Sequence, residues 1–316
     1  MRRLLLIIIV SLSTVSMGCR SAPITGRKQL MTMPEQQELS LGDTTYREIL
    51  SEHPASTDQA AIRMVNRVGQ RLAAVADEPD FQWEFRVIAS DDQNAFCLPG
   101  GKVGVYEGLL PLCHNEAELA VVIAHEVAHA LARHGGERMS HENAVNVVGD
   151  FVKYFSKSRE EATQKRIHQA YGVASKYGVV LPYSRTHESE ADSIGLTLMA
   201  KAGYDPSVAP GFWERFANVA GPKPPEFFST HPSDLKRAEQ LREQLEEAMV
   251  LYDATPQKFG LGEPLQVARR FDAPATNPTN SGAANFGAAG FGPNEQSQPQ
   301  RDPFNPRIRA APTIIR

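Results

Sequence analysis

The sequence lacks most of the features that would place it in a simple compositional class. Its 316 residues include only three cysteines, which excludes a disulfide-rich scaffold. The formal net charge is −4 and 22% of the residues are charged, so no basic surplus indicates a nucleic-acid partner. The apolar run near the N-terminus, residues 4–10, is too short to cross a bilayer. The length suits one sizeable domain and does not require two.

The N-terminus has the pattern of a targeting segment. Two arginines precede the apolar residues 4–10, and Gly18-Cys19 follow. A charged start, an apolar stretch and small residues before a cleavage point are typical of a signal peptide. We therefore expect residues 1–18 to be a lipoprotein-type signal peptide and Cys19 to be acylated, with ordinary secretion or an uncleaved anchor as alternatives. Because Arg20 is not the aspartate of an inner-membrane retention signal, we expect a cell-envelope protein, lipid-anchored in the outer membrane and facing the periplasm, or else secreted and soluble.

The most informative motif is His125-Glu126-Val127-Ala128-His129. On an α-helix, at about 100° per residue, its two histidines leave the same face one turn apart. Their ring nitrogens can bind one metal ion, and Glu126 projects beside them, where it can accept a proton from water at the metal. We expect Asn115 to cap this helix and Gly135-Gly136 to end it. The alternative is a helix whose histidines have ordinary hydrogen-bond partners.

A catalytic zinc needs a third protein ligand. His134 follows His129 by five residues, about 140° around the helix at about 100° per residue, so we expect it to be exposed at the helix C-terminus. Glu188 and Asp192 are better candidates, because they are four residues apart and share one face of a second helix. Glu188 could bind the metal while Asp192 accepts the far N–H of a ligating histidine. A solvated acidic first turn is the alternative.

Other motifs accompany these residues, at residues 25–30, 94–101, 181–185, 188–195 and 199–206. Together they resemble metallopeptidase family forty-eight, which includes HtpX, BepA, LoiP and the CAAX prenyl proteases, and they resemble its periplasmic branch most. The likeness extends over residues 24–251. It implies that His125, His129 and Glu188 bind one Zn²⁺ per chain, that Glu126 is the general base, and that Glu190 is not a ligand.

A further element, Thr230-His231-Pro232 with Arg237, is similar to the His-Pro-x-x-x-x-Arg element of that family. In BepA-like members this histidine can occupy the open metal position and hold the enzyme latent. The resemblance therefore implies a regulatory or catalytic role for His231. Displaced from the metal, its imidazole could donate a hydrogen bond to a developing oxyanion. A His-Pro turn leading into the next helix is the alternative.

Cys97 and Cys113 are the two cysteines outside the N-terminal segment. In an oxidising compartment we expect a disulfide between them if the geometry permits. The alternative is that they are two small buried apolar residues. Their spacing does not match a cysteine-rich zinc site.

Periodicity predicts an α+β fold, with a helical body and a small sheet beside the His125 helix; the resemblance implies a zincin-type (gluzincin) metalloprotease domain. We assign residues 19–29 to a linker, 30–254 to the domain and 255–316 to a low-complexity, disordered tail. Residues 137–180 are long enough for a lid or plug over the site. The expected helices are 34–50, 58–76, 116–134, 158–175, 184–201, 206–218 and 233–250, and the expected strands are 81–88 and 102–106.

These expectations describe a zinc-dependent endopeptidase. The resemblance implies polypeptide substrates, namely unfolded or misassembled cell-envelope proteins. An extended peptide could gain main-chain hydrogen bonds along an exposed strand edge near the zinc. The alternatives are a zinc-stabilised peptide-binding chaperone or assembly factor with latent or little proteolysis, and a purely structural zinc protein. No nucleic-acid partner and no repeat docking domain are expected.

Overall fold

The structure is a computed structural model that describes residues 19–22, 25–157, 159–176, 181–218, 227, 231 and 237–260. The contacts between residues divide the chain into two units, residues 1–267 and 268–316. All described residues belong to the first unit. The predicted signal peptide, the side chain of Cys19 and the tail beyond residue 260 lie outside the described part. The described elements are mainly helices with two small sheets, which confirms the predicted α+β class.

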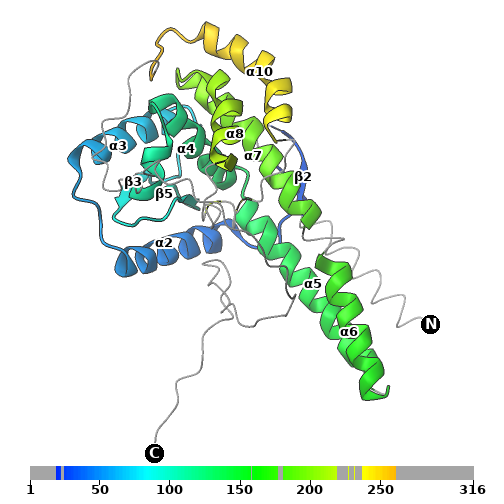
Figure 1. The fold of residues 1–316 in the computed structure, drawn as a ribbon. Helices are drawn as coiled ribbons and strands as arrows, with labels where there is room; N and C mark the ends of the chain where they lie inside the picture. Colours follow the sequence, from blue (N-terminus) through cyan, green and yellow to red (C-terminus); the bar gives the residue numbers. More distant parts are fainter. Residues whose placement is uncertain are drawn as a thin grey trace, which may run out of the picture. The chain divides into compact units, whose positions relative to one another are not determined.

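Helix α4 (Glu116–Leu131) carries the histidine motif and packs on every side. It contacts α3 (Gln59–Ala73), α7 (Leu181–Lys201) and strand β4 (Ala95–Leu98), as Figure 1 shows for the two helices. The helix is rich in Ala, Val, Ile and Leu on all its faces, and nearly all of its residues are buried. A helix that is apolar all round is stable only in a core, so the metal motif has a rigid support.

Two local features position α4. Asn115 Oδ1 accepts a hydrogen bond from the backbone N–H of Glu118 at 3.0 Å, which confirms the predicted N-cap. On the α7 side, a Cβ at Gly195 would lie 3.4 Å from the backbone nitrogen of His125. The missing side chain lets the two helices approach closely, and this brings the motif of α4 next to the acidic residues of α7.

A three-stranded sheet packs beside α4. Its order is β3 (Glu84–Ile88), β5 (Lys102–Tyr106) and β4, with β3 parallel and β4 antiparallel to β5. Both predicted strands are confirmed, although the first begins later than expected. Strand β4 was missed because four residues give too short an alternation to detect. Gly100 and Gly101, with φ of 89° and 81°, make the turn from β4 to β5 at angles that glycine adopts without strain.

The segment expected to be a linker is structured. Strand β1 (Cys19–Ser21) pairs antiparallel with β2 (Lys28–Leu30), with Cys19 opposite Leu30. Gln29 is buried, and its Nε2 donates to the backbone oxygen of Ala132 at 2.6 Å. The N-terminal hairpin is therefore packed against the end of α4.

Helix α4 ends earlier than predicted, and not at the glycines. Its C-cap is Ala132, and Arg133 has a φ of 54°, in the left-handed region. This conformation costs about 1–2 kcal/mol for a non-glycine residue. The side chain of Arg133 is held by Glu38, with Nε to Oε2 at 2.6 Å, and by Glu35 at 3.3 Å. The chain changes direction there, and a new helix begins at once.

That new helix is α5 (His134–Ser156), and it runs through the two glycines that were expected to end α4. Helix α6 (Glu161–Ser175) lies beside it (Figure 1). Tyr171 Oη donates to the backbone oxygen of Val145 at 2.5 Å, which ties the pair together. The described residues of 137–176 therefore form mostly a helical hairpin, and α5 was not predicted.

The other predicted helices are confirmed apart from their ends. Helix α7 begins one turn before the predicted Ser184 cap. Helix α10 (Arg237–Ala254) packs against α7 and α8 (Ala209–Asn218), as Figure 1 shows. None of the helices in the described residues is both long and apolar enough to cross a membrane. The remaining helical elements are α2 (Glu35–Glu52), η1 (Glu107–Leu112) and η3 (Pro206–Val208).

The expected disulfide between Cys97 and Cys113 is absent. Both thiols are free and buried in the apolar core. Each Sγ contacts a backbone oxygen instead, of Leu98 at 3.8 Å and of Leu109 at 3.9 Å. Burial raises the pKa of both thiols above the ordinary value. The two residues therefore pack as small apolar side chains, which was the alternative interpretation.

Candidate metal centre

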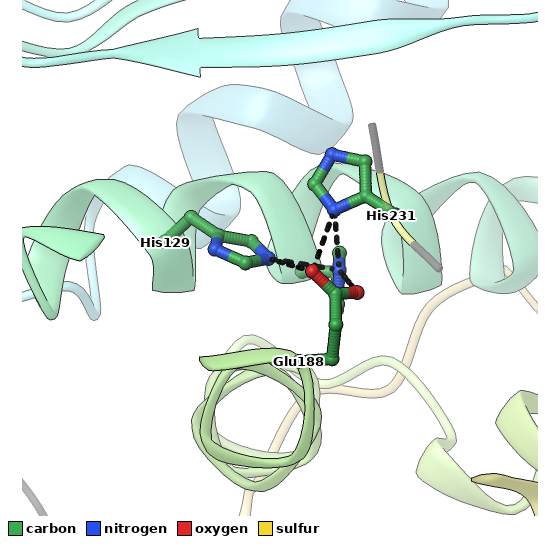
Figure 2. Close-up of side chains that lie close together, drawn as sticks. His129, Glu188 and His231 are labelled. Carbon is green, nitrogen blue, oxygen red and sulfur yellow. Dashed lines mark hydrogen bonds and ion pairs between the residues drawn. The ribbon is translucent and has the colours of Figure 1, made fainter. Parts of the chain in front are cut away.

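Two helices bring three candidate ligands together. His125 and His129 extend from α4 one turn apart, and their Nε2 atoms are 3.1 Å from each other. Glu188 extends from α7, with Oε2 3.3 Å from His125 Nε2 and Oε1 3.4 Å from His129 Nε2. Figure 2 shows His129 and Glu188 pointing toward one another, with the ring of His231 directed at the same point.

The donor atoms suit a single divalent cation. Ligand atoms of His125, His129, Glu188 and His231 all lie within 4.8 Å of one another. In a tetrahedral zinc site with Zn–N bonds of about 2.0–2.1 Å, neighbouring donor atoms are about 3.3 Å apart, close to the spacings of the three ligands. Both Nδ1 atoms on α4 have other partners, so each ring can carry its proton on Nδ1 and offer the lone pair of Nε2 to a cation.

The electrostatics of the ligands also favour a cation. Burial lowers the pKa of His129 well below its usual value, which keeps the imidazole in the neutral, metal-binding form. Burial and the positive charge of Arg237 also lower the pKa of His125. Hydrogen bonds to Asp192 and Glu188 outweigh them and raise this pKa to about 9. Carboxylates that favour a proton on the ring also favour a metal in its place. Glu188 Oε2 is buried, and the contacts nearest to it are His125 Nε2 at 3.3 Å and Arg237 Nη1 at 3.7 Å, neither with good hydrogen-bond geometry.

Asp192 holds His125 from behind. Its Oδ1 accepts from His125 Nδ1 at 3.0 Å, the contact that its spacing from Glu188 predicted. Arg237 donates to both carboxylate oxygens, from Nη2 at 2.6 Å and from Nε at 2.8 Å. Its guanidinium lies 3.7 Å from the centre of the Trp213 ring. Burial opposes the charged form of Asp192, but Arg237 and His125 lower its pKa.

Arg237 is a site residue to which sequence reasoning gave no role. Its place in the element that resembles His-Pro-x-x-x-x-Arg was the available signal, because that element puts an arginine close in sequence to His231. The carboxylate that it binds is on another helix, so that partner could not be read from the motif.

Glu126 lies beside the ligands with little access to solvent. Its Oε1 is 3.4 Å from His231 Nε2 and has no hydrogen-bond partner in the described part of the chain. Burial raises its pKa above the ordinary carboxyl value, against the opposite influence of His231 and His125. A carboxylate with a raised pKa and an unused lone pair suits a proton acceptor.

His231 approaches the site as a fourth donor. Its Nδ1 is 3.1 Å from Glu188 Oε1 and 3.4 Å from His125 Nε2. The ring stacks on Phe227, with centroids 4.4 Å apart. One imidazole therefore faces the ligands with one nitrogen and Glu126 with the other.

The prediction that His134 is exposed is wrong. Its side chain is 4% exposed, because the turn at Arg133 directs it back toward the site. Its Nδ1 is 2.9 Å from His129 Nδ1, and its Nε2 is 3.0 Å from Glu190 Oε2. Burial lowers the pKa of His134 to about 4. For Glu190, burial is outweighed by hydrogen bonds from His134, Thr25 and Arg27, which lower its pKa to about 2.

Comparison with known proteins gives consistent matches. Residues 59–245 match the model of peptidase family M48. The chain is 37% identical over 239 residues to the mitochondrial metalloendopeptidase OMA1 of Schizosaccharomyces pombe, which covers 72% of this chain and 67% of that protein. It is 31% identical over 257 residues to the protein of the same name from Saccharomyces cerevisiae, covering 73% and 70%. It is 28% identical over 218 residues to the beta-barrel assembly-enhancing protease of Yersinia pestis, covering 66% and 44%.

The expected location in the cell envelope is contradicted by these matches. The two yeast relatives, which align over two thirds or more of their own length, are mitochondrial by name. The expectation rested on the pattern of residues 1–20 and on the resemblance to the periplasmic branch of the family. A charged start followed by a short apolar stretch directs a chain toward a membrane system, but it does not identify which one. Acylation of Cys19 remains a prediction, because its side chain is outside the described part.

Proposed function

The chain belongs to peptidase family M48 and is a zinc metalloendopeptidase acting on polypeptides, and we propose that its catalytic zinc is held by His125, His129 and Glu188. One observation carries the proposal. Two imidazole nitrogens from α4 and the carboxylate oxygens of Glu188 from α7 lie 3.1–3.4 Å from one another. We place one zinc ion per chain there.

The surrounding residues divide the work of hydrolysis. Zinc in this position supplies Lewis-acid activation of water and of a peptide carbonyl. Glu126 accepts the proton of the attacking water and returns it to the leaving nitrogen. Asp192 keeps the proton of His125 on Nδ1, which leaves Nε2 free for the metal. Arg237 fixes the Asp192 carboxylate in turn.

We propose extended segments of unfolded or misassembled proteins as substrates. Strand β4 is at an edge of the described three-stranded sheet and packs against α4. The base, Glu126, is on α4, so this edge lies beside the helix that carries it. A peptide paired along such an edge gains main-chain hydrogen bonds with little dependence on sequence. Its carbonyl groups would then pass beside the metal.

Casein cleavage by the full chain tests the activity. Glu126→Gln is the key variant, and Glu247→Gln, at an exposed position of α10, is the matched control. We expect Glu126→Gln to lower kcat/KM by about 10²-fold or more and to retain zinc, since Glu126 is not a ligand. The control should cleave as the wild type does. Undiminished cleavage by Glu126→Gln, or wild-type protein without zinc, would contradict the proposal.

A second candidate function, a peptide-binding protein with latent proteolysis, is favoured by the position of His231. Its Nδ1 sits among the ligands and its Nε2 faces Glu126, so a bound zinc would have four protein donors and no open position. We propose that this arrangement is the resting state and that His231 must leave before hydrolysis.

The variant His231→Ala separates the two functions. If His231 blocks the metal, casein cleavage rises and zinc affinity falls, because one donor is lost. A control at the exposed His114 should change neither. If His231→Ala changes neither activity nor zinc affinity, the latent state is ruled out.

A further inference from the structure

The far nitrogen of His129 has an unusual partner. A metal-binding histidine normally donates its second N–H to a carboxylate, a backbone carbonyl or water, which fixes the ring and its tautomer. His125 follows this pattern through Asp192. His129 does not, because its Nδ1 faces Nδ1 of another histidine, His134, at 2.9 Å.

Only one assignment of protons satisfies this contact when His129 is a ligand. Metal on Nε2 leaves the proton of His129 on Nδ1, so His134 Nδ1 must accept it. A neutral His134 then carries its own proton on Nε2, which lies 3.0 Å from Glu190 Oε2. Each of these ring nitrogens thus either donates or accepts one hydrogen bond. The series of bonds from His129 through His134 ends at the carboxylate of Glu190.

Glu190 is in turn fixed by residues from the N-terminal hairpin. Arg27 Nε donates to Glu190 Oε2 at 2.7 Å, and Thr25 Oγ1 donates to Oε1. The other edge of the guanidinium, Nη1 and Nη2, donates to the two oxygens of Glu137 on α5, at 2.9 and 2.6 Å. Glu137 is fully buried and also contacts His187. Arg27 therefore bridges two buried carboxylates, a geometry that a planar guanidinium suits better than lysine would.

We propose that His134, Glu190 and Arg27 form a positioning relay for His129, a series of hydrogen bonds that fixes its ring. The N-terminal hairpin, which contributes Arg27, is then part of the metal centre. The proposal rests on the proposed function, in which His129 is a zinc ligand. Residues 25–30 lie outside the region that matches the family model, 59–245. The relay is the counterpart of the shorter Arg237–Asp192 pair behind His125, with the imidazole of His134 between the proposed ligand and the carboxylate.

A merely structural role is the competing explanation. His134 is buried and stacks on His187, with centroids 4.2 Å apart and planes 12° apart, and this packing alone could explain its position. The two explanations differ in one respect. A relay alters the zinc affinity and the ligand field at the metal, whereas packing alters only the stability of the protein without metal.

The test uses the full chain with three variants. His134→Phe keeps the ring and its stacking but removes both hydrogen bonds. His134→Asn places an acceptor near the position of Nδ1 and so restores the bond to His129 alone. Arg27→Met removes the anchor of Glu190, and Arg20→Met is the matched control. Arg20 is in the same hairpin and pairs with Glu35, outside the relay.

Zinc dissociation constants from competition with a chelator are the main measurement, with the visible spectrum of the cobalt-substituted protein and the thermal unfolding of the metal-free protein beside them. We expect His134→Phe to weaken zinc binding by about 10–100-fold, as loss of a partner of a ligating histidine does elsewhere, and to shift the cobalt bands. His134→Asn should recover part of the affinity. Arg27→Met should weaken binding less than His134→Phe, and Arg20→Met should not change it.

Unchanged zinc affinity and cobalt spectra in His134→Phe and Arg27→Met, with only a lower unfolding temperature, would overturn the relay. If His134→Phe does not fold, His134→Asn and Arg27→Met decide the question by the same measurements. Wild-type protein that binds no zinc would refute the proposed function itself, which is a different outcome from wild-type binding that the variants leave unaltered.

Discussion

Replacing Asp192 by Asn tests how the centre is supported from behind. The carboxylate accepts from His125 Nδ1 at 3.0 Å and from two nitrogens of Arg237 at 2.6 and 2.8 Å. An amide has the same shape but only one oxygen, so at least one of these donors loses its acceptor. The variant therefore leaves the three proposed ligands in place and removes the carboxylate that orients one of them, His125.

Two effects of different size follow from this geometry. Loss of the partner of a ligating histidine lowers metal affinity by about 10–100-fold, which is about 1.4–2.7 kcal/mol. Arg237 is 5% exposed, and breaking a buried ion pair by removing one partner costs about 3–5 kcal/mol. We expect the free energy of unfolding of the metal-free variant to fall by an amount near the lower end of that range. The amide oxygen still accepts one hydrogen bond, and the guanidinium keeps its contact with Trp213.

Chelator competition measures the first effect, and urea unfolding of the metal-free protein measures the second, with Glu247→Gln as control. Adding Arg237→Met to the Asp192→Asn variant separates them. The double variant has no uncompensated buried charge, so it should regain stability without regaining zinc affinity. If Asp192→Asn binds zinc as tightly as the wild type, Asp192 does not orient His125 and the reasoning fails.

Three further predictions concern other parts of the structure. The pKa of Glu137 is lowered in the folded state, since hydrogen bonds from its arginine and histidine partners outweigh burial. The stability it contributes is therefore present above the unfolded pKa of about 4.3 and is lost as the pH falls below that value. The difference in unfolding free energy between metal-free wild type and Glu137→Gln should narrow from about pH 7 to about pH 3, and a constant difference would exclude this charge effect. A Cβ at Gly69 would lie 2.2 Å from the Phe85 ring, so Gly69→Ala should lower the free energy of urea unfolding by about 1–3 kcal/mol; an unchanged midpoint would show that the ring can move away. The thiols of Cys97 and Cys113 are buried and free, so both should react with a thiol reagent in denaturant without reductant and neither should react in the folded protein; a missing thiol signal in denaturant would reveal a disulfide.

Much of the centre could be predicted from short stretches of sequence. The helical spacing of His125 and His129 puts them on one face whatever surrounds the helix. The same spacing in Glu188 and Asp192 predicted which carboxylate faces the ligands and which stands behind. The positions of these side chains agree with the prediction because both pairs lie within one helical turn, where backbone hydrogen bonds alone fix the geometry. Their role as metal ligands stays a proposal.

The unsuccessful predictions depended on a few backbone angles or on contacts between distant segments. His134 was expected to be exposed because helix α4 was assumed to continue as far as Gly135. One left-handed residue, Arg133, ends the helix earlier and turns His134 inward. Arg133 is stabilised in that conformation by acidic residues of α2, about a hundred residues earlier in the chain. No local sequence pattern predicts a left-handed turn at a residue other than glycine.

The sequence by itself determined the chemistry of this protein: which residues can bind a metal, which can act as a base, and on which helical faces they stand. Only the tertiary structure decided how that chemistry is held. It brought Arg237 to Asp192, Arg27 to Glu190 and His231 to the ligands, and it kept the two core thiols unbonded. The physical reason is the distance along the chain over which each kind of geometry is encoded. Helix geometry repeats over a few residues and is encoded locally, whereas the pairing of buried charges requires segments that the chain separates and only the packed core brings into contact.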